Sequence, residues 1–356
     1  MKLQKIKHSL PNIHSIFDDF DLLYYQYSEK NPYKSNLNIL WENRLPYCFK
    51  YLTDIFEKYG GIKSAYMYNS EKCKKLHLPK YNPKNIIVCF SGGKDSLAAV
   101  LHYKKLGYNI YLYHLKGINK AYPKEYEQAE RLADALNLVL YTESIKLSGN
   151  HLYTEHPMKN MITANRALQF GIRHNIGIKV AFGNYYTAML DNNVFDICAG
   201  DCRDMWNAYE NIIKTIIPKF HIYIPLKNVK TTLKALESHK GLLGLCCSCM
   251  APYRYREYWK SNVENKYNIT LPQNRCGLCW KCALEYIYYV DHNIWEYQEN
   301  YYIHCLEVLL HNSEKENKKH SDIYDLWNSY LFYDIKKSRW GGIKNAIIQG
   351  KKIKYK

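Results

Sequence analysis

A short stretch, "FSGGKDS", has the residue types and spacing needed to bind an anion. Gly92 and Gly93 allow the backbone to turn tightly and bring its amides close to a ligand. An apolar run precedes the glycines and a helical pattern follows, and the positive end of a helix favours an anion. Ser91 and Ser96 add hydroxyl groups, and Lys94 adds a positive charge. The stretch therefore predicts a phosphate-binding loop over residues 91–96.

Asp95 is the unexpected member of this loop, because an acid beside a phosphate is unfavourable unless a cation lies between them. The loop also lacks the G-x-x-x-x-G-K-[ST] spacing of the common nucleotide-binding loop. Asp95 therefore predicts a bound Mg²⁺, or alternatively a cap on the first amides of the helix.

The cysteines form a second group with chemical potential. The chain has 12 cysteines, and six of them lie between residues 246 and 282. In an intracellular protein such clustering favours a metal over disulfides. The stretch "CGLCWKC" supplies three thiolates, and "CCSC" supplies a fourth, which gives the set Cys249, Cys276, Cys279 and Cys282. Cys246 and Cys247 are alternatives to Cys249.

Four thiolates leave no open coordination position, so this set predicts structural Zn²⁺. An iron–sulfur cluster takes the same four ligands and is the alternative.

The elements that must position these groups alternate along the chain. Short apolar runs typical of buried strands are separated by helical patterns at a spacing that predicts a doubly wound parallel sheet. The expected strands are 85–90, 109–115, 138–145, 178–183 and 220–226, and the expected helices are 96–107, 123–137, 158–175 and 204–217. From about residue 283 the pattern is helical to the end, with a charged break at 312–320.

With the loop placed after the first strand, the chain resembles the ATP pyrophosphatase superfamily, whose fold is adenine nucleotide alpha hydrolase-like. The resemblance implies that ATP and Mg²⁺ are bound and that the loop, residues 91–96, holds the β,γ-pyrophosphate. It also implies that a substrate attacks the α-phosphate, which yields an adenylate and pyrophosphate.

Four stretches, in order, are similar to one family of that superfamily, the 7-cyano-7-deazaguanine synthases of queuosine and archaeosine biosynthesis. They are "FSGGKDS", "PMKNMITANRALQFG", "AGDCRDMW" and "SCM…CGLCWKC". The resemblance covers roughly residues 84–287. Residues 250–275, between the two cysteine stretches, are longer than the short loop usual in the family.

The family reaction implies the roles of further residues. The enzyme adenylates the carboxylate of 7-carboxy-7-deazaguanine, ammonia displaces AMP, and a second adenylation of the amide yields the nitrile. The resemblance places Lys159 and Asn160 with Asp201 and Arg203 at the deazaguanine or its carboxylate. It implies catalytic roles for Asp95, Lys94 and Arg203.

Three other functions remain as alternatives. A diverted family member would pass the activated deazaguanine to a protein or nucleic-acid amine, in phage modification or anti-phage defence. A tRNA-modifying sulfurtransferase would belong to another branch of the superfamily. A non-catalytic nucleotide-binding module would retain the loop without the reaction.

The composition limits the class of protein and the partners that it could bind. The 356 residues are 47% hydrophobic and carry a formal net charge of +17, which permits a real core and an anionic partner. The basic residues are spread along the chain, which favours a solvated surface. No apolar run approaches the roughly 20 residues that span a bilayer, so we expect a cytoplasmic protein without a membrane partner.

We expect three regions: a helical N-terminal extension (1–80), an ATP-binding domain with a zinc-binding insert (84–287), and a helical C-terminal extension (288–356). The extensions are candidates for docking a partner, for forming a homodimer, or for binding nucleic acid through the basic tail.

Overall fold

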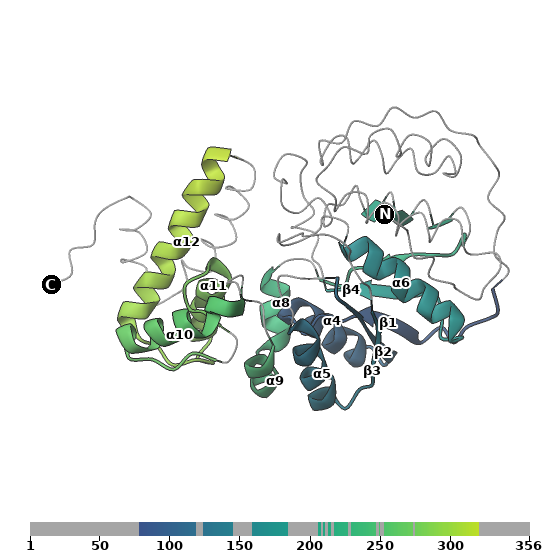
Figure 1. Ribbon diagram of the computed structural model, residues 1–356, viewed down its shortest axis with the longest axis horizontal. Helices are drawn as coiled ribbons and strands as arrows, with labels where there is room; N and C mark the ends of the chain where they lie inside the picture. Colours follow the sequence, from purple (N-terminus) through teal and green to yellow (C-terminus); the bar gives the residue numbers. More distant parts are fainter. Residues whose placement is uncertain are drawn as a thin grey trace.

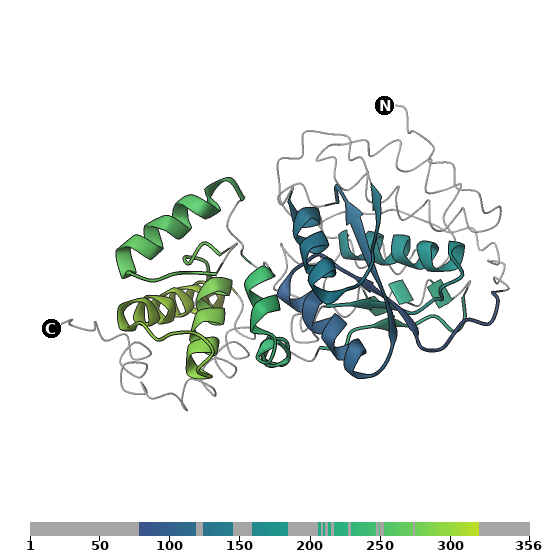
Figure 2. The ribbon, with the colours of Figure 1, turned by 90° about the horizontal axis from the view of Figure 1, so that it is seen from below.

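The computed structural model is drawn in Figures 1 and 2. It describes residues 78–118, 124–144, 159–183, 206–207, 209–210, 213–214, 217–226, 229–246, 249, 253–272 and 275–319.

A parallel sheet of five strands forms the centre of the described chain. Its strands are β1 (Asn85–Cys89), β2 (Asn109–Lys116), β3 (Leu140–Ser144), β4 (Val180–Phe182) and β5 (Ile222–Tyr223). They lie in the order β3-β2-β1-β4-β5, and every neighbouring pair is parallel. This arrangement confirms the predicted α/β class with a parallel sheet.

Helices cover both faces of the sheet (Figure 1). Helices α4 (Lys94–Lys105) and α5 (Glu125–Leu136) pack on one face, and α6 (Lys159–Arg173) packs on the other. Because side chains alternate along a strand, Ile86 and Val88 of β1 join the core beneath α4 and α5. Ile87 points the other way, towards Gly171 of α6. Burial on both faces explains why β1 is a continuous apolar run.

A helical part lies beside the sheet (Figures 1 and 2). Helices α8 (Val229–Leu236) and α9 (Lys240–Leu245) pack against α4 and α5, respectively. Beyond them lie α10 (Tyr253–Tyr267), α11 (Trp280–Asp291) and α12 (Glu299–Lys319). One hydrophobic cluster runs from Ile86 and Leu97 to Tyr289 and Leu309. The sheet and the helices α8–α12 therefore share a continuous core.

Several predicted boundaries differ from the observed ones, and β5 covers only part of the predicted strand 220–226. Helix α4 begins at Lys94 and not at residue 96, so Lys94 and Asp95 lie in its first turn. Helix α12 continues to Lys319, across most of the predicted break at 312–320. Glutamate and lysine are strong helix formers, so a charged run can extend a solvated helix.

The predicted N-terminal extension lies outside the described residues, apart from 78–80, and so does the end of the C-terminal extension. Within the described part of the chain, no helix is both long and apolar enough to cross a membrane.

Candidate functional site

The topology places the loop at residues 91–93 where a parallel sheet offers a binding crevice. β1 is followed in sequence by its neighbour β2 on one side, whereas β4 lies on its other side. Such a reversal of strand order opens a crevice at the carboxyl ends of the strands, where ligands bind in open α/β sheets. The loop leaves the carboxyl end of β1 at this point and leads directly into α4.

Two glycines allow the loop to fit closely against its neighbours. Gly92 has a φ of +75°, and an added Cβ would lie 2.8 Å from the backbone nitrogen of Ala129 in α5. Gly183, just after β4, lies so close to α4 that an added Cβ would be 2.3 Å from the carbonyl carbon of Asp95. The loop therefore packs closely against the backbone of α5, and the first turn of α4 packs closely against the backbone that follows β4.

The hydroxyl groups of the loop bond within the loop itself. Ser96 Oγ donates to the carbonyl oxygen of Gly93 at 2.9 Å, and the Gly93 amide donates to Ser91 Oγ at 3.4 Å. The first amides of any α-helix have no partner within the helix, which leaves this end of α4 suited to an anion.

Asp95 does not cap α4. The N-cap residue is Gly93 and makes no side-chain capping bond, whereas Asp95 lies inside the first turn. Among the described residues, Asp95 Oδ1 is buried without a hydrogen-bond partner, and Oδ2 lies 3.8 Å from Lys94 Nζ. The capping alternative is therefore wrong. An unpartnered carboxylate oxygen at a helix N-terminus, which is itself suited to an anion, is of the type that could hold Mg²⁺.

His114 lies near the end of β2 and supports the strand that leads to the loop. Its Nδ1 lies 2.9 Å from the carbonyl oxygen of Phe90, the residue that precedes the loop. Burial lowers the pKa of this imidazole, so it is neutral at pH 7 and its Nδ1–H donates to that carbonyl. Sequence reasoning did not single out His114.

The predicted substrate residues fall partly within the described chain. Lys159 and Asn160 are the first two residues of α6. Because α6 connects parallel strands, it runs against them, and its first turn lies at the same edge of the sheet as the loop. Asp201 and Arg203 lie outside the described residues.

The four predicted metal ligands come together in a compact group. The sulfur atoms of Cys249, Cys276, Cys279 and Cys282 all lie within 4.8 Å of one another. Distances between sulfurs include 3.4 Å for Cys279 to Cys282 and 4.0 Å for Cys279 to Cys249. Tetrahedral Zn²⁺ with bonds of about 2.3 Å places its sulfurs about 3.8 Å apart, so the group fits a single ion. We call these residues the four-cysteine site.

Backbone amides and the start of a helix lie against the four-cysteine site. The amides of Leu278 and Cys279 each donate to Cys276 Sγ at 3.3 Å. Cys279 is the N-cap of α11, and Cys282 lies in the first turn, where the helix dipole stabilises negative charge. Tyr301 Oη of α12 donates to the carbonyl oxygen of Gly277 at 2.9 Å, which ties the turn to the core.

The alternative ligand Cys246 lies apart from the site. Its thiol donates to the carbonyl oxygen of Leu243 at 3.3 Å, and Arg275 Nη2 lies 3.6 Å from its sulfur. Burial raises the pKa of Cys246 to about 11, so the thiol is protonated at pH 7. Cys247, the other alternative, lies outside the described residues.

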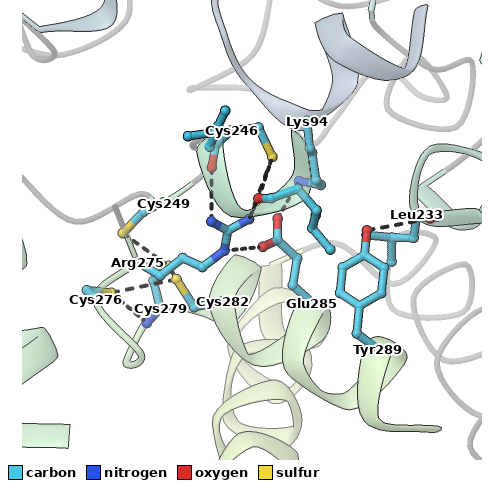
Figure 3. A network of polar contacts seen from close by, with 12 residues as sticks. Lys94, Leu233, Cys246, Cys249, Arg275, Cys276, Cys279, Cys282, Glu285 and Tyr289 are labelled. Atoms are coloured by element: carbon cyan, nitrogen blue, oxygen red, sulfur yellow. Dashed lines mark hydrogen bonds and ion pairs between the residues drawn. The ribbon is translucent and has the colours of Figure 1, made fainter. Parts of the chain in front are cut away.

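A buried ionic network connects the four-cysteine site with the loop (Figure 3). Glu285 of α11 accepts from Arg275 Nε at 2.8 Å, and its other oxygen lies 3.7 Å from Lys94 Nζ. The three side chains are at most 3% exposed. Burial lowers the pKa of Lys94, but the carboxylates of Asp95 and Glu285 more than offset this effect, so its pKa lies above the usual value.

Sequence reasoning missed Gly183, Arg275 and Glu285. Arg275 directly precedes a predicted metal ligand and Glu285 follows one by three residues, but no local pattern reports that either reaches the loop. A glycine at the end of a strand run is the one signal that could have indicated Gly183.

No protein-family model matches the chain, and no curated protein matches it. The properties of the site therefore rest on its own geometry.

Proposed function

We propose that this protein is an ATP-dependent ligase that adenylates a carboxylate and releases pyrophosphate. The observation that carries the proposal is the loop at residues 91–93, which lies at the carboxyl end of the central strand and leads into the N-terminus of α4. That position suits the phosphates of a nucleotide. The loop sequence, its place after β1 and the four-cysteine site together support the adenine nucleotide alpha hydrolase-like fold.

In this proposal the chain binds, orients and stabilises charge, and no side chain forms a covalent intermediate. The first amides of α4 would hold the leaving pyrophosphate, together with the hydroxyls of Ser91 and Ser96. Asp95 would hold Mg²⁺, which neutralises charge on the phosphates when bound. Preformed donors directed at developing charge lower the barrier because they need no rearrangement during the reaction.

For the substrate we propose 7-carboxy-7-deazaguanine, with ammonia as the second substrate and 7-cyano-7-deazaguanine as the product. The support is the order of the four resembling stretches. Arg203 would suit the carboxylate, since its planar guanidinium can meet both oxygens, and Lys159, Asn160 and Asp201 would contact the deazaguanine. The four-cysteine site would hold Zn²⁺ in a structural role.

The test measures AMP and pyrophosphate from ATP, 7-carboxy-7-deazaguanine and ammonia, with mass spectrometry of the deazaguanine product. Asp95→Asn should reduce pyrophosphate release at least about 100-fold, because the magnesium ligand loses its charge. Asp134→Asn, an exposed aspartate of α5, is the matched control and should retain the wild-type rate. Absence of pyrophosphate release from the wild type would refute the proposal.

A second candidate, the diverted enzyme, is favoured by α10. This helix lies in the long segment between the cysteine stretches and exposes Tyr255 and Tyr258 to solvent, the latter by 65%. Metabolism of a small molecule does not require such a surface, whereas a macromolecular acceptor could contact it. Complete conversion to the nitrile, whatever macromolecule is added, would exclude this candidate. A mass increase of an added protein or nucleic acid by one deazaguanine acyl group would support it.

A further inference from the structure

The two carboxylate oxygens of Glu285 face different partners, Arg275 in the helical part and Lys94 at the loop. Oε2 accepts from Arg275 Nε at 2.8 Å. Oε1 lies 3.7 Å from Lys94 Nζ and, among the described residues, has no hydrogen-bond partner. The side chains of Lys94 and Glu285 are 3% and 2% exposed. An ion pair so well shielded from solvent is little screened by salt, and loss of Glu285 would leave two buried cations with less compensating charge.

Arg275 fixes the position of Glu285. Its Nη1 donates to the carbonyl oxygen of Cys246 at 2.9 Å, and its Nη2 donates to that of Leu243 at 3.2 Å. Its guanidinium carbon lies 5.8 Å from the centre of the Trp295 ring. These contacts hold the planar guanidinium group of Arg275 in an orientation that directs Nε towards Glu285.

Arg275 and Glu285 each lie close in sequence to a ligand of the four-cysteine site. Arg275 directly precedes Cys276, and Glu285 lies on α11, one turn after Cys282. Figure 3 shows the cysteines, Arg275, Glu285 and Lys94 in succession. A shift of the cysteine turn would therefore displace the partner of the loop lysine.

We propose that Glu285 is a positioning residue of the phosphate loop, which makes the geometry of the loop depend on the four-cysteine site through Arg275 and Lys94. Lys94 is the first residue of α4, so the position of its side chain bears on the helix end that faces the anion. The anionic ligand rests on the function proposed above, whereas the coupling between Glu285 and the loop does not.

The first experiment measures hydrogen exchange of loop amides 91–97 in the metal-loaded full chain. Glu285→Gln keeps the shape of the side chain but removes the carboxylate that Lys94 and Arg275 share, so that Lys94 keeps only the more distant carboxylate of Asp95 beside it among the ion pairs described above. It should accelerate exchange in the loop about tenfold. Glu257→Gln, an exposed glutamate of α10, removes the same charge as a matched control and should exchange at the wild-type rate.

A general loss of stability is separated from positioning by two further measurements. The Glu285→Gln variant must keep the metal content and the cooperative melting of the wild type. The hydrogen-exchange rate of helix α6 serves as an internal reference. Should Glu285→Gln fail to fold, Glu285→Asp keeps the charge but shortens its reach to Lys94, and it should also accelerate exchange in the loop. Wild-type exchange in the folded variant would overturn the proposal.

The second experiment measures the affinity for inorganic pyrophosphate in a double-mutant cycle. Glu285→Gln should weaken binding about tenfold. In a Lys94→Met background the same change should have an effect of less than about twofold, because the group that Glu285 positions is gone. Equal effects in both backgrounds would overturn the role assigned to Lys94. Wild-type protein that binds neither pyrophosphate nor ATP would refute the proposed function, and loop exchange would still decide the coupling.

Discussion

At the scale of single residues, the loop depends on close backbone contacts as much as on its polar side chains. Gly183 has no chemistry of its own, yet it adjoins the carbonyl group of Asp95 and the amide of Ser96. Only a residue without a Cβ allows β4 and α4 to approach so closely. A residue without a functional side chain therefore helps to determine where the loop atoms lie.

We predict that Gly183→Ala lowers the free energy of unfolding by about 1–3 kcal/mol, because the added methyl group overpacks the contact. The same change should weaken pyrophosphate binding. Its added Cβ would lie 2.4 Å from the Asp95 carbonyl oxygen and the Ser96 amide nitrogen, and backbone atoms cannot move aside as a flexible side chain does. Urea denaturation measures the loss. Gly241→Ala in α9, where no atom lies within 4 Å of the added Cβ, should not destabilise the protein. Equal stability of both variants would contradict this account.

At the scale of elements, Arg275 links the end of α9 with Glu285 of α11. It donates to the last carbonyls of α9, at Leu243 and Cys246, and to Glu285 of α11. The last carbonyls of a helix lack partners within it and attract a cation. The buried guanidinium of Arg275 therefore satisfies carbonyl oxygens at the end of α9 and compensates the carboxylate of Glu285 in α11.

We predict that Arg275→Lys lowers the free energy of unfolding by about 3 kcal/mol, although the charge is kept. A lysine cannot donate to three acceptors in the fixed directions of a guanidinium. Thermal and chemical denaturation measure the change. Arg131→Lys serves as control, because Arg131 is exposed and its Nε donates to the carbonyl oxygen of Glu127 at 3.3 Å. A loss below about 1 kcal/mol for Arg275→Lys would show that charge alone suffices.

At the scale of the molecule, the sheet and the helical part are not independent. The hydrophobic core continues from Val88 and Leu97 through Leu233 of α8 to Ile287 and Leu306. Ala283, which adjoins Cys282, belongs to the same cluster. The four-cysteine site therefore lies at the margin of the shared core.

Removal of the metal should lower the free energy of unfolding by more than about 3 kcal/mol, since metal binding and folding are coupled at such sites. Calorimetry of the purified protein with and without a chelator measures this loss. Unfolding should remain a single transition because the core is continuous. Elemental analysis should give one zinc per chain and no iron. Two separate transitions, or visible absorbance from iron, would contradict this view.

The sequence alone determined the features that depend on local patterns. Apolar runs with helical patterns between them predicted the parallel sheet, because burial on both faces requires unbroken apolar strands. The spacing of Cys276, Cys279 and Cys282 predicted a metal site, because a turn and the start of a helix can bring such thiolates together. A phosphate-binding loop over residues 91–96 was predicted from a local pattern as well, since its members are neighbours in the chain, and its ligand stays a prediction.

Only the tertiary structure decided what distant residues do to one another. It selected Cys249 over Cys246, placed Asp95 inside the first turn of α4, and brought Gly183 against that turn. It also joined Lys94 to Glu285, far along the chain. Buried charges and close backbone contacts are satisfied by partners that folding brings into reach, and no local sequence pattern records which partner that will be.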